Sequence, residues 1–198
     1  MLKKRMDSPP YKGMIIALSA PSGTGKTTVA TKVLRKIPGI VRSVSLNTRP
    51  PRPLEIHGVD YIFVSEDEFD DNIKKGNLIE FVEIYGFRRG TPKDTLLESR
   101  ERGLDTLCII EWTGMKHLKE HFGPSVVSIF LLPPSLEKLR LRLITRAQDS
   151  NEEIERRLAL AQEEMTNAAD YDHVVLNDDL NVCVRKVVKI IKNERKRC

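Results

Sequence analysis

The strongest constraint on the fold is a short apolar run that leads into a glycine-rich loop and then a helical pattern. Residues 14–18 are all apolar, which is typical of a buried strand at the centre of a parallel sheet. Residues 20–27 read A-P-S-G-T-G-K-T, a Walker A pattern in which alanine replaces the first glycine. From Lys26 to Ile37 apolar residues recur every three or four positions, which predicts a helix ended by Pro38 and Gly39. Strand, loop and helix in this order indicate a phosphate-binding loop.

The chemistry of such a loop depends on backbone amides that converge on one anion. Gly23 and Gly25 let the chain turn so that N–H groups point inward, and the following helix adds the positive end of its dipole. Lys26 supplies a full charge to the β- and γ-phosphates, and the Thr27 hydroxyl can coordinate Mg²⁺. An ordinary glycine turn with an exposed lysine is the alternative. We expect a nucleoside triphosphate with Mg²⁺ on Ala20, Pro21, Ser22, Gly23, Thr24, Gly25, Lys26, Thr27 and Thr28.

Short apolar runs return at residues 106–110, 126–132 and 173–176, each followed by turn residues and a helical pattern. This alternation predicts an α/β fold of the P-loop NTPase type, a mostly parallel sheet with helices on both faces. Residues 61–64 and 78–83 are strand-like and lie close together without a long helix between them. They predict a small lobe inserted into the sheet domain.

Two helix starts carry a capping pattern, in which a serine is followed three residues later by a glutamate. The pairs are Ser65 with Glu68, before a helix that Gly76 ends, and Ser150 with Glu153. A short polar interruption at residues 145–150 separates the second of these helices from the one before it.

Composition narrows the class of protein. With 198 residues, 40% of them hydrophobic, the chain is long enough for one domain with a sizeable core. The apolar run at 126–132 is too short to span a membrane, and residues 1–10 lack the apolar stretch of a secretory signal, so we expect a cytoplasmic protein. The three cysteines form no C-x-x-C pair, which disfavours a disulfide framework or a cysteine zinc site.

The net charge of +5 belongs to the two ends of the chain. Residues 1–12 hold four Lys or Arg and one acid, and residues 185–198 hold seven Lys or Arg and one acid. The part between them is therefore acidic in sum. Together with the lack of a recognisable reading motif, this disfavours a nucleic-acid-binding face.

A second phosphate site is indicated by Arg49 and Arg52 in the segment N-T-R-P-P-R-P. The prolines stiffen the backbone and hold two guanidinium groups three residues apart, which suits bidentate binding of a phosphate monoester. A solvated basic loop is the alternative. Beside a phosphate loop, an acceptor site is the better interpretation, because a kinase needs one.

Seven blocks in order resemble the signature segments of the guanylate kinase family, from about residue 13 to about residue 194. They read A-P-S-G-T-G-K-T, S-L-N-T-R-P-P-R, G-V-D-Y, I-E-F, G-T, L-P-P-S and N-D-D. The resemblance implies ATP-dependent phosphorylation of GMP, and of dGMP, to GDP by direct in-line transfer in purine nucleotide metabolism. It divides a single domain, 1–198, into a core (13–44, 92–144 and 158–194), a monophosphate-binding lobe (45–91) and a lid (145–157).

The resemblance also implies the roles of individual residues. Lys26, Arg142, Arg146 and Arg157 are expected to be catalytic, and Asn177 to contact the adenine of ATP. The GMP site is expected to comprise Ser45, Arg49, Arg52, Tyr61, Glu80, Arg89, Thr91 and Glu111. Glu80 suits guanine because a carboxylate can accept both N1–H and the exocyclic amino group, whereas adenine would leave the charge unpaired.

The chain departs from the family pattern at three places. Arg89 stands where the family has a tyrosine, and a pair of aspartates is replaced by Ile109 and Glu111. Thr145 and Ala147 replace glycines that flank Arg146. We expect retained function with an altered affinity for the acceptor, and a metal shell that depends on Glu111 alone.

Other functions remain open from the sequence. Residues 117–121 read H-L-K-E-H, a zinc-peptidase pattern, although a third ligand is not evident. A non-catalytic guanylate-kinase-like module would bind protein partners with the same fold, but such modules typically have degraded phosphate loops. The sequence leaves the choice between monomer and homodimer undecided.

Overall fold

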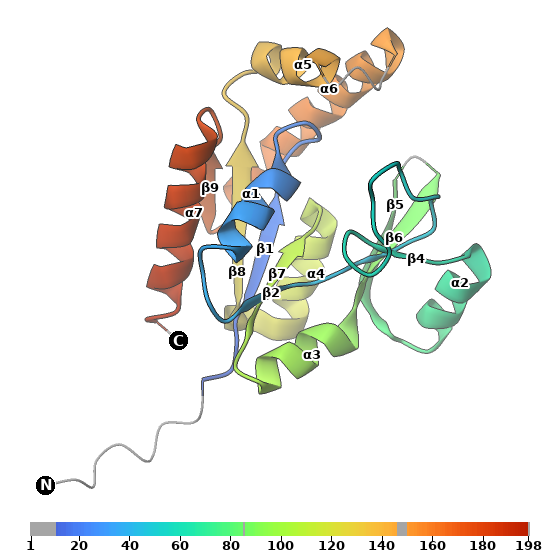
Figure 1. The fold of residues 1–198 in the computed structure, drawn as a ribbon, viewed down its shortest axis with the longest axis vertical. Coiled ribbons are helices and arrows are strands. Elements are labelled where there is room, and N and C mark those ends of the chain that lie inside the picture. Colours follow the sequence, from blue (N-terminus) through green and yellow to red (C-terminus); the bar gives the residue numbers. More distant parts are fainter. Residues whose placement is uncertain (1–10, 85, 146–149, 198) are drawn as a thin grey trace, which may run out of the picture.

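A five-stranded parallel sheet forms the centre of the molecule (Figure 1). The computed structural model describes residues 11–84, 86–145 and 150–197. The strand order is β2-β7-β1-β8-β9, and every neighbouring pair runs parallel. The predicted α/β fold is confirmed, with the strand before the glycine loop in the middle of the sheet. The strands are β1 (Ile15–Ser19), β2 (Ile40–Arg42), β7 (Asp105–Ile109), β8 (Val126–Leu132) and β9 (His173–Leu176).

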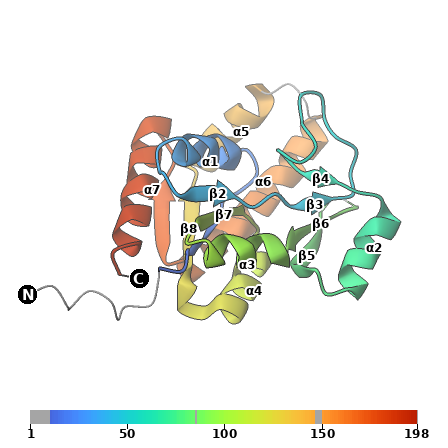
Figure 2. The same cartoon turned by 60° about the horizontal axis from the view of Figure 1, so that its bottom comes forward.

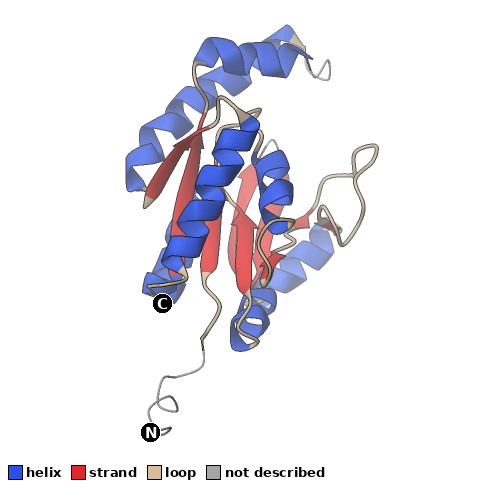
Figure 3. Ribbon diagram, turned by 60° about the vertical axis from the view of Figure 1, so that its left-hand side comes forward, coloured by secondary structure: helices blue, strands red, loops and turns tan. Residues whose placement is uncertain are grey.

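Helices cover both faces of this sheet because the side chains of β1 alternate between two apolar clusters. Ile16 and Leu18 pack against α1 (Lys26–Leu34) and α7 (Leu180–Glu194). Ile15 and Ala17 face α3 (Lys93–Glu101) and α4 (Trp112–Phe122). Figure 3 shows the strands with helices on either side. The first helix ends at Leu34, three residues before the predicted limit at Ile37. Cys108 and Cys183 are free and buried in this core.

A second, mixed sheet lies to one side of the first (Figure 2). Its order is β4-β3-β6-β5, in which β3 and β4 are parallel and the other pairs antiparallel. The strands predicted at 61–64 and 78–83 occur as β4 and β5. The division of the chain into core, lobe and lid stays a prediction. The elements here are β3 (Leu46–Asn47), β4 (Ile62–Phe63), α2 (Glu66–Lys74), β5 (Leu78–Ile84) and β6 (Phe87–Pro92).

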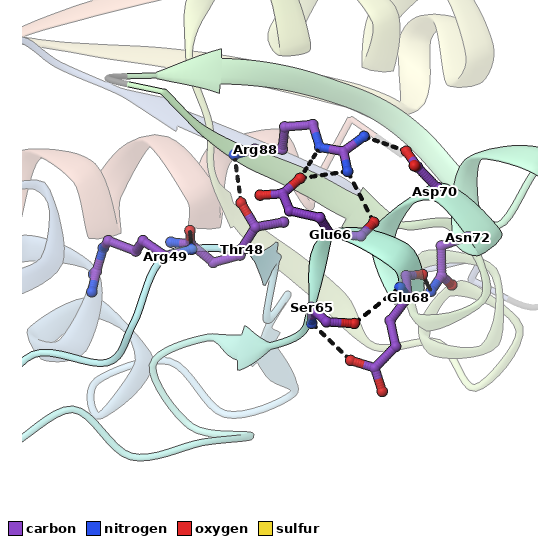
Figure 4. A network of polar contacts seen from close by, with 9 residues as sticks. Thr48, Arg49, Ser65, Glu66, Glu68, Asp70, Asn72 and Arg88 are labelled. Carbon is purple, nitrogen blue, oxygen red and sulfur yellow. Dashed lines mark hydrogen bonds and ion pairs between the residues drawn. The ribbon is translucent and has the colours of Figure 1, made fainter.

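The predicted capping box at Ser65 starts α2. Ser65 Oγ accepts from the Glu68 N–H at 3.2 Å, and the Ser65 N–H donates to Glu68 Oε2 at 2.7 Å (Figure 4). On β6, Arg88 donates to the Glu66 carboxylate at 2.7 Å and also contacts Asp70, so it ties α2 to the sheet. In Figure 4 the Arg49 side chain points away from this cluster.

At Ser150 the first half of the predicted box is present, because Ser150 Oγ accepts from the Glu153 N–H at 3.2 Å. The Glu153 carboxylate turns to arginines of its own helix instead, lying 3.1 Å from Arg157 Nε and 3.3 Å from Arg156 Nε. The return bond that a full capping box requires, from the Ser150 N–H to the Glu153 carboxylate, is not seen among the described residues, so this half of the prediction is wrong. The neighbouring guanidinium groups engage the carboxylate instead.

Two helices stand beyond the carboxyl end of the parallel sheet, α5 (Leu136–Thr145) and α6 (Asn151–Thr166) (Figure 1). They pack on each other through a separate apolar cluster that includes Leu139, Leu143 and Ile154. Most of the predicted polar interruption, residues 146–149, lies outside the described residues. Two short 3-10 helices, η1 (Gly123–Ser125) and η2 (Asn167–Asp170), complete the chain, and among the described residues every helix is too short or too polar to cross a membrane.

Candidate active site

The glycine-rich loop joins β1 to α1 at the carboxyl end of the central strand. Gly23 has φ +85° and Gly25 has φ +101°, a backbone region that glycine adopts far more readily than residues with a side chain. The Lys26 ammonium donates to the carbonyl of Ala20, so the lysine lies back across the loop. Thr24 is 1% exposed, and its hydroxyl has no hydrogen-bond partner among the described residues. The left-handed glycines give the loop the shape of a phosphate-binding loop, and the Thr24 hydroxyl is a donor without a partner among the described residues.

A pocket of about 460 Å³ borders this loop on the side of α5 and α7. Asn177 Nδ2 donates to the Thr24 carbonyl at 2.6 Å, and Arg142 Nη2 donates to the Asn177 carbonyl at 3.0 Å. Gly25, Thr28 and Asp178 also line the pocket. Asn177 is thus within reach of a nucleotide on the loop. Arg142 lines this pocket and braces backbone carbonyls, away from the larger cleft described next.

The larger cleft, about 870 Å³, lies between the phosphate loop, the mixed sheet and α6. It unites most of the residues that the sequence singled out from distant parts of the chain. Those that line it are Pro21, Ser22, Gly23, Gly25, Lys26, Thr27, Thr28, Arg49, Arg52, Tyr61, Arg89, Glu111 and Arg157. A cleft with a phosphate loop at one end and a group of arginines at the other can hold two phosphorylated molecules.

Arg49 is held in one orientation by a carboxylate that the sequence analysis missed. Glu55 accepts from Arg49 Nη1 at 2.7 Å and from Nη2 at 2.6 Å, and also from the Arg52 N–H at 2.8 Å. These hydrogen bonds raise the pKa of Arg49 and lower that of Glu55. The Tyr61 ring lies under the same guanidinium, with 5.4 Å between the ring centre and Arg49 Cζ. The only sequence signal for Glu55 is an acid three residues after Arg52.

Glu80 and Thr91 face each other across β5 and β6. The Thr91 hydroxyl donates to Glu80 Oε1 at 2.6 Å. Glu80 is 6% exposed, and this burial raises its pKa while the Thr91 hydrogen bond opposes the rise. A Cβ on Gly114 of α4 would lie 3.0 Å from Glu80 Cδ and 2.5 Å from Ile110 Cγ1, so only glycine lets α4 come this close. Glu80, Thr91 and the buried Ser45 lie outside the lining of the large cleft.

The two unusual residues of the sequence, Arg89 and Glu111, contact each other. Arg89 Nη1 lies 3.5 Å from Glu111 Oε1, and Lys26 Nζ lies 3.8 Å from the same oxygen. The Arg89 guanidinium also stacks over Tyr61 at 5.1 Å from the ring centre. Glu111 occupies the N-cap position of α4 without a side-chain capping bond, and it follows the end of β7 by two residues, which places its carboxylate at the sheet edge beside the phosphate loop.

The predicted convergence of arginines is seen in part. Arg157 of α6 lines the large cleft, where its Nε lies 3.1 Å from Glu153. Arg142 lines the smaller pocket instead, because its guanidinium is held by carbonyls next to Asn177. Arg146 lies outside the described residues.

Several further charged residues line the cleft that sequence reasoning did not identify. Glu164 is the most unusual of them, since burial raises its pKa to about 7 although Lys26 acts in the opposite direction. It follows Arg157 by seven residues on α6, so helical spacing could have placed both on one face. The others are Arg42, Glu55, Asp60, Glu83, Glu153 and Arg156.

The residues present suit a Mg²⁺ ion that arrives with a nucleotide. The Thr27 side chain is exposed at the cleft, and Glu111 lies close to Lys26. Mg²⁺ in kinases is held by one or two protein groups, phosphate oxygens and waters, so a dedicated cage is not required. In the described part of the chain no group of three His, Cys, Asp or Glu could hold a metal ion, which leaves His117 and His121 without a third ligand there.

The raised pKa of Glu164 makes a prediction about stability. The folded protein keeps the proton up to about pH 7, whereas a free glutamate with a pKa of 4.5 loses it earlier. The free energy of unfolding should therefore fall as pH rises from about 5 to about 7, and this part of the fall should vanish in Glu164→Gln. Urea unfolding at several pH values measures it. Glu163→Gln, an exposed neighbour, is the control, and an unchanged pH profile in Glu164→Gln would contradict the assignment.

Comparisons with known proteins agree with this geometry. A family model described as guanylate kinase matches residues 12–194. The chain is 44% identical over 184 residues to a guanylate kinase of Wolbachia pipientis wMel, covering 93% of this chain and 92% of that protein. It is 42% identical to a guanylate kinase of Coxiella burnetii, covering 93% and 89%. The crystal structure of guanylate kinase from Anaplasma phagocytophilum superposes with a TM-score of 0.79 at 34% identity, over 93% of this chain and 87% of that one. The chain belongs to the guanylate kinase family.

Proposed function

We propose that this protein transfers the γ-phosphoryl group of ATP, bound with Mg²⁺, to GMP and dGMP, giving ADP and the nucleoside diphosphate in the cytoplasm. The observation that carries the proposal is the single cleft of about 870 Å³, in which a phosphate loop with Lys26 faces Arg49, Arg52 and Arg89. Near-full-length similarity to proteins named guanylate kinase supports the same substrates.

The main barrier is the approach of two groups of negative phosphate oxygens. Arg49 and Arg52 bind the acceptor phosphate, with Arg49 held ready by Glu55 and Tyr61. Lys26 binds the β- and γ-phosphates, and Arg157 neutralises charge on the group in transfer. Thr27 would hold Mg²⁺ together with the phosphates, and the ion would supply further neutralisation there. Because the phosphates of both nucleotides meet in one cleft, the acceptor oxygen attacks directly and in line, and no side chain carries the phosphoryl group.

Guanine is recognised by Glu80. Its buried carboxylate accepts a hydrogen bond from Thr91 at one oxygen, Oε1, and can accept the N1–H and amino donors of guanine with its remaining lone pairs. A base that offers an acceptor at this edge would leave a buried charge unpaired, which costs binding energy. On the donor side, the pocket at Asn177 and Arg142 receives the adenine.

A non-catalytic binding module is the second candidate. It would need no positive charge poised at the loop, whereas Lys26, Thr27 and the loop glycines are all present here.

The substrate panel tests the proposed activity. ADP release from MgATP is followed in a coupled assay with GMP, dGMP, AMP, UMP or CMP as acceptor. GMP and dGMP should stimulate release strongly and the others weakly. Lys26→Ala should abolish stimulation, because the transferring phosphates lose their charged partner. A wild-type rate with GMP that stays at the ATP-only background would rule out the enzyme and favour the binding module.

Base selection is tested by Glu80→Ala. Because the variant removes the acceptor for the two guanine donors, it should lower kcat/KM for GMP by about 10- to 100-fold, with a much smaller change in KM for ATP. The ratio of kcat/KM for GMP to that for AMP should fall. Glu120→Ala removes one exposed carboxylate from α4 and should leave that ratio unchanged. Equal losses with GMP and AMP in Glu80→Ala would contradict a role in reading the base.

A further inference from the structure

One carboxylate oxygen connects the two halves of the cleft. Glu111 Oε1 lies 3.8 Å from Lys26 Nζ on the phosphate loop and 3.5 Å from Arg89 Nη1 on β6. Lys26 begins α1, which follows the central strand of the parallel sheet, whereas Arg89 belongs to β6 of the mixed sheet. The side chains of Lys26, Glu111 and Arg89 are 16%, 23% and 23% exposed, so water screens these contacts less than it would on an open surface.

The Arg89 guanidinium is fixed on two sides and lacks a hydrogen-bond partner on a third. Its flat face lies over the Tyr61 ring, and its Nη1 is directed to Glu111. Its Nε is buried and has no hydrogen-bond partner in the described part of the chain. A buried donor without a partner is costly, and it is satisfied when an acceptor enters. Since Arg89 lines the cleft beside Arg49 and Arg52, an oxygen of the acceptor phosphate is the group that fits.

We propose that Glu111 is a positioning residue that acts through Arg89: the ion pair holds the guanidinium so that its Nε meets the acceptor phosphate. This rests on the proposed function. Without Glu111, Arg89 loses the contact that fixes its rotation over Tyr61. Without Arg89, Glu111 keeps Lys26 as its cation and no longer influences the acceptor. The two residues therefore act as one unit in binding GMP.

The second contact of Glu111 adds a consequence for the donor. Removing its charge frees Lys26 of an anionic neighbour and leaves the contact with the Ala20 carbonyl in place. Glu111→Gln should thus alter KM for ATP as well as KM for GMP, whereas Arg89→Gln should alter KM for GMP alone. This split distinguishes a carboxylate shared between two cations from a general loss of structure.

A double-mutant cycle tests the unit. Binding of GMP without ATP is measured by calorimetry for the wild type, Arg89→Gln, Glu111→Gln and the double variant. Each single change should weaken binding by about tenfold. The double variant should bind about as well as either single one, whereas additive effects would weaken binding about a hundredfold, so the departure from additivity is about tenfold. Arg89→Lys keeps the charge and should recover part of the loss.

Arg88→Gln is the matched control, because it removes a neighbouring arginine of β6 that pairs with Glu66 and Asp70 (Figure 4), and none of these three residues lines the cleft. It should leave the affinity for GMP within about twofold of the wild type. Additive effects of the two single changes, or a loss in Arg88→Gln as large as in Arg89→Gln, would overturn the proposal. If the wild type itself fails to bind GMP, the proposed function fails.

Discussion

Electrostatic repulsion between phosphates is the constraint that organises this molecule. Lys26 supplies a positive charge to counter this repulsion, at the end of a turn that depends on glycines. Its ammonium group contacts the Ala20 carbonyl and lies next to Glu111. The loop can hold this shape because it follows β1, which is the central strand of the sheet and is buried on both faces. The mixed sheet and α6 then bring further arginines to the same opening, although the protein between residues 13 and 184 is acidic in sum.

The positions of the main strands and of the phosphate loop could be predicted because they follow from local rules. The continuous apolar run of β1, the left-handed backbone at Gly23 and Gly25, and the serine cap at Ser65 all depend on residues close in sequence. Arg49 and Arg52 beside a phosphate loop already indicated an acceptor site, and the seven family blocks extended that prediction to Ser45, Tyr61, Glu80 and Thr91.

The contacts within the site could not be predicted in the same way. The pairing of Arg49 with Glu55, and of Arg89 with Glu111, depends on rotamers and on how β6 approaches the end of β7. Glu153 could have closed a capping box, but nearby guanidinium groups engage its carboxylate. Arg142 has the same charge as Arg157 and yet lines another pocket, because the carbonyls of Asn177 and Asp178 hold its guanidinium. Competition among several partners decides each case.

Direct transfer of the phosphoryl group requires that the phosphates of both nucleotides meet in one cleft. Its most direct test is to quantify ADP, GDP and inorganic phosphate together while the protein acts on MgATP and GMP. Direct transfer predicts that ADP and GDP form in equal amounts and that no inorganic phosphate is released. ADP accompanied by an equal amount of inorganic phosphate, without GDP, would contradict it.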